Sequence, residues 1–364
     1  MKNTIGNNLT VTIYGESHGK AIGAVIDGIA SGLDVDENFI SRCLDRRRPK
    51  DATSTPRREK DDFEINSGVF NGKTTGTPVC ITIPNADTHS SDYSEMQYKM
   101  RPSHADYTAN CRYGGFQDFR GGGHFSGRIT AALAATGGII IPALNKKGIY
   151  IGTHIKSIAG INDSDFGSDS DIINISKKDF PVVNDSAARD MKNRILSAKE
   201  KGDSVGGVLE TAVIGLPAGV GEPWFDTVEG MLSHAIFSVP AVKGIEFGLG
   251  FGFADSTGSS ANDQMYTDDG KTVKCYTNNN GGVIGGITNG MPVVFRCVVK
   301  PTPTISAEQK TVDIKNMKNT TLASHGRHDP CIVHRAAVVI ESVTALVIAD
   351  MLIGKYGTEW LSKQ

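Results

Sequence analysis

Near its start the chain contains the segment Leu9-Thr10-Val11-Thr12-Ile13-Tyr14-Gly15-Glu16-Ser17-His18-Gly19, which gives the first indication of β-structure. Apolar and polar residues alternate from Leu9 to Tyr14, which is typical of a strand with one buried face. The alternation stops at the polar segment 15–19 and resumes over residues 21–29, so we predict two strands joined by a loop. Histidine in a polar loop is a candidate acid or base, which makes His18 a candidate catalytic residue.

A helix is predicted next, from Asp36 as its cap to the residue before Pro49. Its buried face is formed by four residues at helical spacing: Phe39, Ile40, Cys43 and Leu44. Its last turn presents Arg46, Arg47 and Arg48, which together with Arg57 and Arg58 form either a solvated helix end or a fork for a carboxylate or phosphate.

The remaining pattern predicts an α+β protein. Strands are expected at residues 205–214 and 292–299, and helices after Ser126, over 185–201, after Asp226 and over 334–352. No low-complexity linker divides the chain, so residues 1–364 are predicted to form a single compact domain. Residues 21–27 and 204–210 resemble each other, and either an internal pseudo-repeat or convergent strand composition explains the likeness.

The composition argues against several classes of protein. The net charge is −2, from 38 basic and 40 acidic residues, so no overall field attracts nucleic acid or an anionic membrane. The six cysteines form no Cys-x-x-Cys pair, which disfavours a disulfide scaffold and indicates a reduced cytosol. Residues 1–8 lack the apolar core of a signal peptide, and the apolar segments 131–144 and 336–353 are interrupted, so we expect a cytoplasmic protein with no membrane span.

Two segments carry charge of one sign. Residues 41–60 hold eight basic and three acidic residues, so any basic site is local. Residues 163–171 hold four aspartates and no base, and this segment is predicted to be a solvated loop.

A glycine-rich segment, Arg120-Gly121-Gly122-Gly123-His124-Phe125-Ser126-Gly127-Arg128, leads directly into an alanine-rich helix. Its backbone amides and the positive end of the helix are expected to face the same point as the two guanidinium groups, which predicts an anion site. A flexible turn capped by Ser126 is the alternative. The spacing is not that of a Walker loop.

A second glycine-rich segment covers residues 280–290 and contains two glycine pairs. Its backbone can lie against a flat ligand or make a tight hairpin. The segment Lys300-Pro301-Thr302-Pro303-Thr304 follows it and offers an ammonium group and hydroxyls on a stiff, extended backbone. Together the two segments predict a cofactor site.

Further candidate residues lie in two more loops. His104 lies in Arg101-Pro102-Ser103-His104-Ala105-Asp106-Tyr107, where neighbouring polar groups can hold an imidazole near its working pKa. Near the last helix, His325, His328, Cys331 and His334 recur every three residues. Pro330 breaks the helix that a metal site at this spacing needs, so we predict no metal there and prefer Arg327 as an anion ligand and Asp329 as a hydrogen-bond relay.

These segments together resemble the chorismate synthase family. The resemblance rests on residues 15–19, 101–108, 120–128 and 326–331, and on residues 221–226, 240–244 and 280–290 in the same order. It implies the last step of the shikimate pathway, in which 5-enolpyruvylshikimate-3-phosphate loses phosphate and one ring hydrogen by 1,4-anti elimination to give chorismate. It also implies reduced FMN (FMNH2) as cofactor and a homotetramer of subunits in which antiparallel β-sheets sandwich helices.

The resemblance implies a role for each matching residue. His18 would protonate the departing phosphate, His104 would stabilise the reduced flavin, and Asp329 would assist proton transfer. FMN would contact His124, Phe125, Ser126, Pro240, Ala241, Gly285, Lys300, Pro301, Thr302, Pro303, Thr304 and Arg327. Substrate would contact Ser17, Arg48, Arg128 and Arg335, and NADPH as a reductant would contact Arg47.

Two positions depart from the family's pattern. His124 stands where the family most often has arginine, so one donor replaces several at a flavin contact. Residues 50–55 lack the usual basic residue, which weakens the expectation of an NADPH site. The competing functions are a different flavin-dependent oxidoreductase and a non-catalytic phosphate- or RNA-binding module, and the near-neutral charge argues against RNA.

Overall fold

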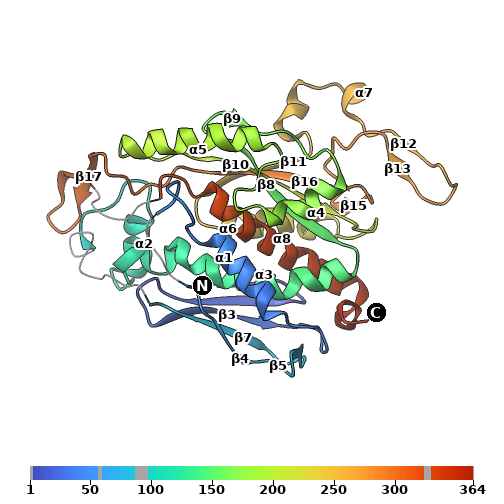
Figure 1. Cartoon of the computed structure of the whole chain (residues 1–364), viewed down its shortest axis with the longest axis horizontal. Helices are drawn as coiled ribbons and strands as arrows, with labels where there is room; N and C mark the ends of the chain where they lie inside the picture. Colours follow the sequence, from blue (N-terminus) through green and yellow to red (C-terminus); the bar gives the residue numbers. More distant parts are fainter. Residues whose placement is uncertain (1–2, 56–59, 87–96, 324–328, 364) are drawn as a thin grey trace.

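A computed structural model describes residues 3–55, 60–86, 97–323 and 329–363. Two five-stranded antiparallel sheets enclose a layer of helices, so the chain is an α+β sandwich as the sequence predicts (Figure 1). The first sheet has the strand order β1 (Thr4–Ile5), β2 (Thr10–Gly15), β3 (Ala21–Asp27), β7 (Val79–Pro84) and β4 (Glu64–Ser67). The second has the order β11 (Val242–Phe247), β16 (Val293–Val299), β10 (Gly207–Ile214), β8 (Tyr150–Ile158) and β9 (Ile161–Asn162).

The helical layer consists of α1 (Glu37–Arg47), α3 (Thr130–Lys146), α6 (Val228–Ser238) and α8 (Val333–Tyr356) (Figure 1). Helices α3 and α8 are long and apolar enough to cross a membrane by length and composition alone. Both are largely buried between the sheets, and core helices of this kind pass the same test. They pack against each other and carry much of the hydrophobic core.

Smaller elements lie outside this sandwich. Helix α4 (Asp169–Asn174) packs on β8 and forms a small hydrophobic cluster with β10 outside the main core. Helix α5 (Asp185–Glu200) lies beside the β8–β9 edge of the second sheet and joins the main core, and α2 (Asp106–Tyr113) lies at one end of the helical layer (Figure 1). The short pairs are β5 (Val69–Phe70) with β6 (Lys73–Thr74), β12 (Met265–Tyr266) with β13 (Lys274–Cys275), β14 (Val283–Ile284) with β15 (Ile287–Thr288), and β17 (Gln309–Asp313) with β18 (Lys318–Leu322). Helix α7 (Gly258–Ala261) and the β12–β13 pair form an arm that projects from the body (Figure 1).

Two adjacent glycines let the three long core helices approach closely. A Cβ atom on Gly137 of α3 would lie 2.2 Å from Ser342 Oγ and 2.7 Å from the Cα atom of that residue, in α8. A Cβ atom on Gly138 would lie 2.8 Å from the Cα atom of Ile40, in α1. Only glycine therefore fits at either position without separating the helices.

A buried ion pair also joins α1 to α8. Arg46 donates two hydrogen bonds to Glu341, at 2.6 and 2.9 Å, and the Glu341 side chain is 2% exposed. Glu341 also accepts a hydrogen bond from the backbone N–H of Thr153 in β8, at 3.2 Å. Because all of these donors face one carboxylate, the pair orients the end of α1 relative to both α8 and the second sheet.

Most of the predicted elements are confirmed. Asp36 caps α1 by accepting from the backbone N–H groups of Asn38 and Phe39, and Gly202 follows α5 with a φ of +67°. The two similar segments fall on β3 and β10, each of which is the middle strand of its sheet. The prediction of a solvated acidic loop is wrong for Asp163, which is buried because it accepts hydrogen bonds from His154 and from the backbone of Val183 and Asn184. Asp165 and Asp169 are exposed as predicted, but Asp169 and Asp171 lie in α4 and not in a loop.

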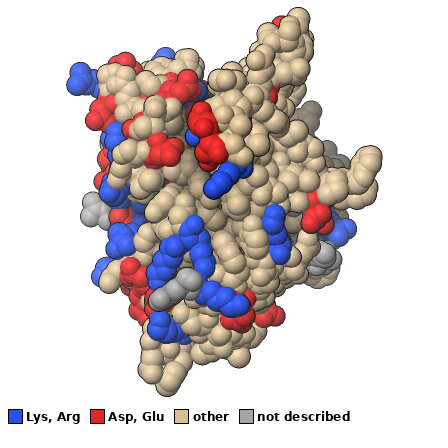
Figure 2. Space-filling view, turned by 90° about the vertical axis from the view of Figure 1, so that its right-hand side faces the viewer, with Lys and Arg blue, Asp and Glu red and all other residues tan. Residues whose placement is uncertain are grey.

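The surface mixes charges of both signs. Figure 2 shows basic side chains gathered near the middle of one face, with acidic side chains beside and among them. On the surface Asp34, for example, pairs with both Lys73 and Lys146. This arrangement agrees with the small net charge.

Substituting Gly137 tests the close approach of α3 and α8. Alanine favours a helix by about 1 kcal/mol over glycine, but its Cβ atom would overlap Ser342. We expect Gly137→Ala to lower the free energy of unfolding by about 1–3 kcal/mol, measured by urea denaturation. Adding Ser342→Gly removes two of the overlapping atoms and should recover part of the loss, whereas a Gly137→Ala variant more stable than the parent would contradict this packing.

Candidate active site

A cavity of about 1050 Å³ lies where the helical layer meets β1, the segment between β1 and β2, and the loop that follows β16. The first residues of α3 and α8 line it, so the positive ends of two helix dipoles face its interior. Single-ligand pockets have volumes of roughly 300–1,000 Å³, so this cavity has room for two ligands at once.

Most of the predicted ligand residues line this cavity. They are Arg47, Arg48, His104, His124, Phe125, Ser126, Arg128, Pro240, Ala241, Lys300, Thr302, Pro303, Thr304, Asp329 and Arg335. Ser17 and His18 lie directly behind its wall, next to Gly121. Arg327 lies outside the described residues, as do Arg57, Arg58, His325 and His328.

The glycine turn separates the two candidate catalytic histidines. Gly121 and Gly122 have φ values of +57° and +86°, which other residues rarely adopt. A Cβ atom on Gly121 would lie 2.5 Å from the His18 ring, and one on Gly122 would lie 3.1 Å from the His104 ring. The bare backbone therefore lets both imidazoles approach one point of the cavity wall.

His124 helps to fix this arrangement. Its Nδ1 atom lies 2.7 Å from the carbonyl oxygen of Gly15, so Nδ1 carries the proton and donates. The backbone N–H of Ser17 donates to the carbonyl of Gly123 at 3.1 Å. Both bonds tie the loop that carries His18 to the glycine turn, which gives the imidazole at this position a holding role.

His104 is oriented by a buried carboxylate. Its Nδ1 atom lies 2.6 Å from Asp106, which also accepts two side-chain hydrogen bonds from Arg101 at 2.8 Å each. Burial by itself raises the pKa of Asp106, but the bonds from Arg101 and His104 outweigh it and hold the pKa below its usual range. The ionised Asp106 therefore fixes the ring orientation of His104.

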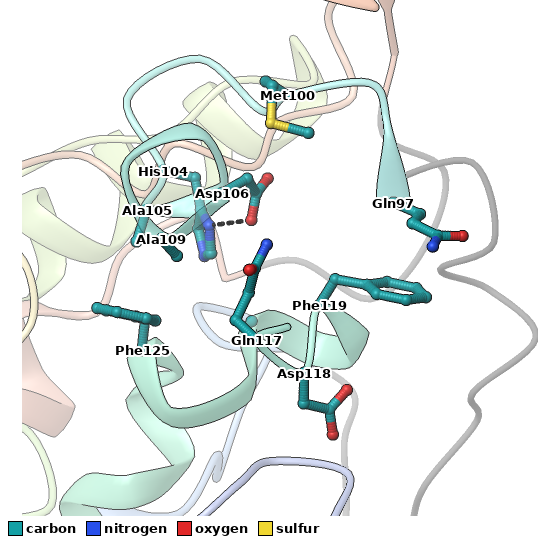
Figure 3. A pocket seen from close by; sticks show the side chains of 11 residues that line it. Gln97, Met100, His104, Ala105, Asp106, Ala109, Gln117, Asp118, Phe119 and Phe125 are labelled. Atoms are coloured by element: carbon teal, nitrogen blue, oxygen red, sulfur yellow. Dashed lines mark hydrogen bonds and ion pairs between the residues drawn. The ribbon is translucent and has the colours of Figure 1, made fainter. Parts of the chain in front are cut away.

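A small pocket lies beside the same histidine. Figure 3 shows the dashed contact between His104 and Asp106, with the amide of Gln117 pointing towards both residues. The pocket has about the volume of one water molecule, and Phe125 lines both it and the large cavity. His104 thus lies between the two spaces.

Two arginines in the cavity wall share one carboxylate. Asp61 accepts a hydrogen bond from Arg47 at 2.8 Å through Oδ2 and one from Arg128 through Oδ1. Arg128 also donates to Asn85 at 3.0 Å and to the carbonyl of Pro84 at 3.2 Å. Burial raises the pKa of Asp61, but the two guanidinium groups outweigh it and the net pKa is lowered, so the carboxyl stays ionised.

A second aspartate holds Arg335, at the start of α8. Asp329 accepts from Arg335 at 2.6 Å and from the backbone N–H of Thr55 at 2.9 Å. Arg335 also donates to the carbonyl of Arg47 at 2.7 Å, which joins this pair to the Asp61 cluster. Burial lowers the pKa of Arg335 and the nearby Asp329 opposes that effect. Arg48 is more exposed and pairs with Asp45 at 3.2 Å.

Several buried polar atoms have no hydrogen-bond partner within the described part of the chain, among them atoms of Gln117, Asn278 and His334. Three others belong to predicted ligand residues: Ser17 Oγ, Arg47 Nε and Thr302 Oγ1. An unsatisfied buried polar group costs about 1–3 kcal/mol, so its persistence at a cavity indicates a position where a ligand supplies the missing partner.

Two lysines form a second cationic part of the cavity. Lys243 and Lys300 both line it, and Lys300 donates to the carbonyl of Ser103 at 2.5 Å. Burial and repulsion from Lys243 lower the pKa of Lys300. An anion between the two ammonium groups would relieve that repulsion.

His334, which follows the predicted hydrogen-bond relay Asp329 in the sequence, has a structural role. His334 Nε2 lies 2.8 Å from Ser54 Oγ, and its ring stacks on Phe180 at a centroid distance of 5.6 Å. Cys331 is buried, and burial raises the pKa of its thiol to about 12. Both side chains pack inside the protein and face neighbouring residues.

Two residues of the glycine-rich segments that the sequence predicts to contact ligands do not line the cavity. Arg120 was expected to face the anion site beside Arg128, but it does not line the cavity because it makes two hydrogen bonds to Asp118 at 2.8 Å each. Gly285 lies at the turn of the β14–β15 hairpin and does not line the cavity either. The next residue, Gly286, packs on Thr227, beside a segment that does line it.

Several residues that the structure brings to the site had no role predicted for them from the sequence. Asp61, Arg101, Lys243 and His234 all line the cavity, and Asp106 orients His104. Asp106 could have been identified from its place two residues after His104. Asp61 carried no comparable signal, because its partners lie 14 and 67 residues away.

Comparison with known proteins gives one consistent family. A family model described as chorismate synthase matches residues 9–353. The chain is 45% identical over 355 residues to the chorismate synthase of Dehalococcoides mccartyi and 44% identical over 356 residues to that of Methanobrevibacter smithii, with 97% of each chain covered in both cases. A solved crystal structure of a chorismate synthase, 30% identical, has a TM-score of 0.76 and covers 97% of this chain and 94% of its own.

The buried His334 should make stability depend on pH. Burial lowers its pKa to about 4, whereas the unfolded chain takes up a proton near pH 6.5. Between these values the unfolded state binds more protons, so the free energy of unfolding falls as the pH falls from 6.5 to 4. Over this pH range the free energy of unfolding of the parent should fall by about 2–3 kcal/mol more than that of His334→Gln, which lacks the titrating group. Denaturation curves of both proteins recorded across the range measure this difference. Equal slopes for both proteins would show that His334 titrates normally.

Proposed function

This chain belongs to the chorismate synthase family, and from that premise we propose how its cavity eliminates phosphate and one ring hydrogen from 5-enolpyruvylshikimate-3-phosphate to give chorismate. The proposal depends on one observation: His104, Arg128, Arg335 and Asp329 line a single cavity, and His18 lies directly behind its wall. The substrate carries two carboxylates and a phosphate, which need several permanent cations.

The arginine cluster would bind the substrate's anionic groups. Arg48, Arg128 and Arg335 line one part of the cavity, where the N-termini of α3 and α8 add to the positive potential. Planar guanidinium groups suit carboxylate and phosphate because they donate two parallel hydrogen bonds. The buried hydroxyl of Ser17 would donate to the same ligand.

His18 would protonate the departing phosphate. Its ring lies against Gly121, at the cavity wall, beside Ser17 and close to the start of α3. A general acid must lie within hydrogen-bond reach of the group it protonates, and the glycine turn allows that approach. The loop that holds His18 is fixed by His124 and by the backbone of Gly123, so the imidazole is preorganised.

His104 would stabilise negative charge on the cofactor. Asp106 holds the Nδ1 side of the His104 ring, which leaves Nε2 to contact the cofactor. Asp329, held by Arg335 and Thr55, would assist proton movement on the opposite side of the site. Asp329 and His104 thus occupy different positions in the site and are held by different residues.

The cavity residues fit FMN. The paired ammonium groups of Lys243 and Lys300 and the hydroxyl of Thr302 would bind its phosphate, and Phe125 with the backbone of Pro240 and Ala241 would contact the ring system. Reduced FMN would supply the electron-rich ring that makes cleavage of an unactivated C–H bond accessible. Arg47 lies in the same cavity wall, so NADPH as a flavin reductant would meet it there in the absence of substrate.

We further propose that the protein is cytoplasmic, that it forms a homotetramer and that it binds a small-molecule substrate. Its six cysteines are free thiols, as in a reducing compartment. Trp224, Phe225 and Phe251 are 85%, 92% and 84% exposed, and exposed aromatic side chains of this size favour contact with other subunits. The mixed surface charge in Figure 2 does not favour nucleic acid.

An anaerobic assay tests the reaction. Reduced FMN mixed with the chain and 5-enolpyruvylshikimate-3-phosphate should release phosphate and form chorismate with no net oxidation of the flavin. Oxidised FMN alone should give no release, and oxidised FMN with NADPH would show whether the chain uses that reductant. Absence of phosphate release with reduced FMN would refute the proposed function, and net flavin oxidation would favour an oxidoreductase.

Substitution of the histidines tests their roles. His18→Ala and His104→Ala should each lower kcat about a hundredfold or more, because each removes a proton donor at the site. Asp106→Asn should lower kcat about tenfold to a hundredfold, because it removes the carboxylate that orients His104. Flavin binding, followed by fluorescence, serves as the folding control. If one of these variants turns over at a near-normal rate with FMN supplied in reduced form, the substituted residue has no role in the mechanism.

A further inference from the structure

Asp61 occupies an unusual place in the cavity wall. Its side chain is fully buried, and its backbone has a φ of +54°, a conformation that only a few residue types tolerate. Arg47 reaches it from the end of α1, and Arg128 reaches it from the start of α3. A single carboxylate therefore connects two elements that each bring one guanidinium group to the cavity.

Two guanidinium groups close together repel each other unless an anion lies between them. Asp61 supplies that anion, and its ionised form persists because both arginines favour it. Among the described residues, the four arginines of this cluster, Arg47, Arg48, Arg128 and Arg335, pair with three carboxylates, those of Asp45, Asp61 and Asp329. Asp61 is the one of the three that holds two of these arginines at once.

The neighbouring Arg46 shows what a purely structural pair looks like in this chain. Arg46 and Glu341 make two matched hydrogen bonds, and neither residue lines the cavity. Arg47 differs in both respects, because it lines the cavity and its buried Nε atom has no partner within the described ranges. The Asp61 pair thus leaves one donor of Arg47, the buried Nε atom of a cavity-lining residue, without a partner among the described residues.

We propose that Asp61 is a positioning residue for the anionic substrate, holding Arg47 and Arg128 as a fixed pair that receives a carboxylate or phosphate. This inference rests on the proposed function and extends it by a residue that contacts no reacting atom. It also places Arg47 in the substrate subsite. Loss of the Asp61 charge would let the two guanidinium groups separate, so ligand affinity would fall before the chemical step is affected.

The test compares Asp61→Asn with Asp62→Asn, a matched change at the adjacent, exposed aspartate. The dissociation constant of 5-enolpyruvylshikimate-3-phosphate is measured by calorimetry with oxidised FMN present, so that no turnover occurs. Asp61→Asn should raise it about tenfold, and Asp62→Asn should leave it within twofold of the parent. In turnover with reduced FMN, Asp61→Asn should raise KM about tenfold and change kcat less than threefold.

A double-mutant cycle separates positioning from general stability. Arg47→Lys should weaken substrate binding about tenfold in the parent but less than threefold in the Asp61→Asn background, because the fixed pair is already lost there. Effects that simply multiply, or an Asp61→Asn protein that binds as tightly as the parent, would overturn the proposal. If Asp61→Asn fails to fold, Asp61→Glu keeps the charge but displaces both arginines, and unchanged affinity in that variant would overturn it equally.

A further titration distinguishes failure of the positioning role of Asp61 from failure of the proposed function. If the parent protein does not bind 5-enolpyruvylshikimate-3-phosphate, the proposed function fails. The same proteins are then titrated with inorganic phosphate, for which the positioning role predicts the same order of affinities. Equal phosphate affinity in the parent and in Asp61→Asn would reject the role of Asp61 whatever the substrate is.

Discussion

Burying arginine side chains beside a ligand cavity requires carboxylates in fixed positions, and the rest of this structure depends on meeting that constraint. An uncompensated buried charge costs several kcal/mol, so each arginine near the end of α1 or the start of α8 has its own acidic partner. Glu341 holds Arg46, Asp61 holds Arg47, and Asp329 holds Arg335. Because these carboxylates come from α8 and from loops, their pairs also fix where the elements around the cavity lie.

The second constraint is steric. Glycine at 137 and 138 lets α3 lie against α8 and α1, and this close packing brings the first turns of α3 and α8 to the same cavity. Glycine at 121 and 122 then lets the backbone pass between His18 and His104. In both places the absence of a side chain is the functional property, since any Cβ atom would displace a helix or an imidazole.

Much of the site follows from local sequence. The cap at Asp36, the end of α1 before Pro49 and the glycine turn before α3 are short-range signals, and they brought Arg47, Arg48 and Arg128 into the expected set. Arg120 shows where such reasoning fails. Its position beside the glycines suggested an anion ligand, but Asp118, two residues away, offers a carboxylate that its guanidinium reaches first. Gly285 shows a related failure, because its turn was predicted but its place relative to the cavity depends on how the hairpin packs.

The sequence by itself determined the fold class, most helix and strand positions and the family, because periodicity, caps and motifs are encoded over short stretches of chain. Only the tertiary structure decided which charges meet. Asp61 lies between Arg47 and Arg128 because two helices and a loop converge there, and Asp163 lies buried beside His154 rather than in solvent. Such pairings join residues that are distant along the chain, and their energy depends on burial and separation, which no local pattern encodes.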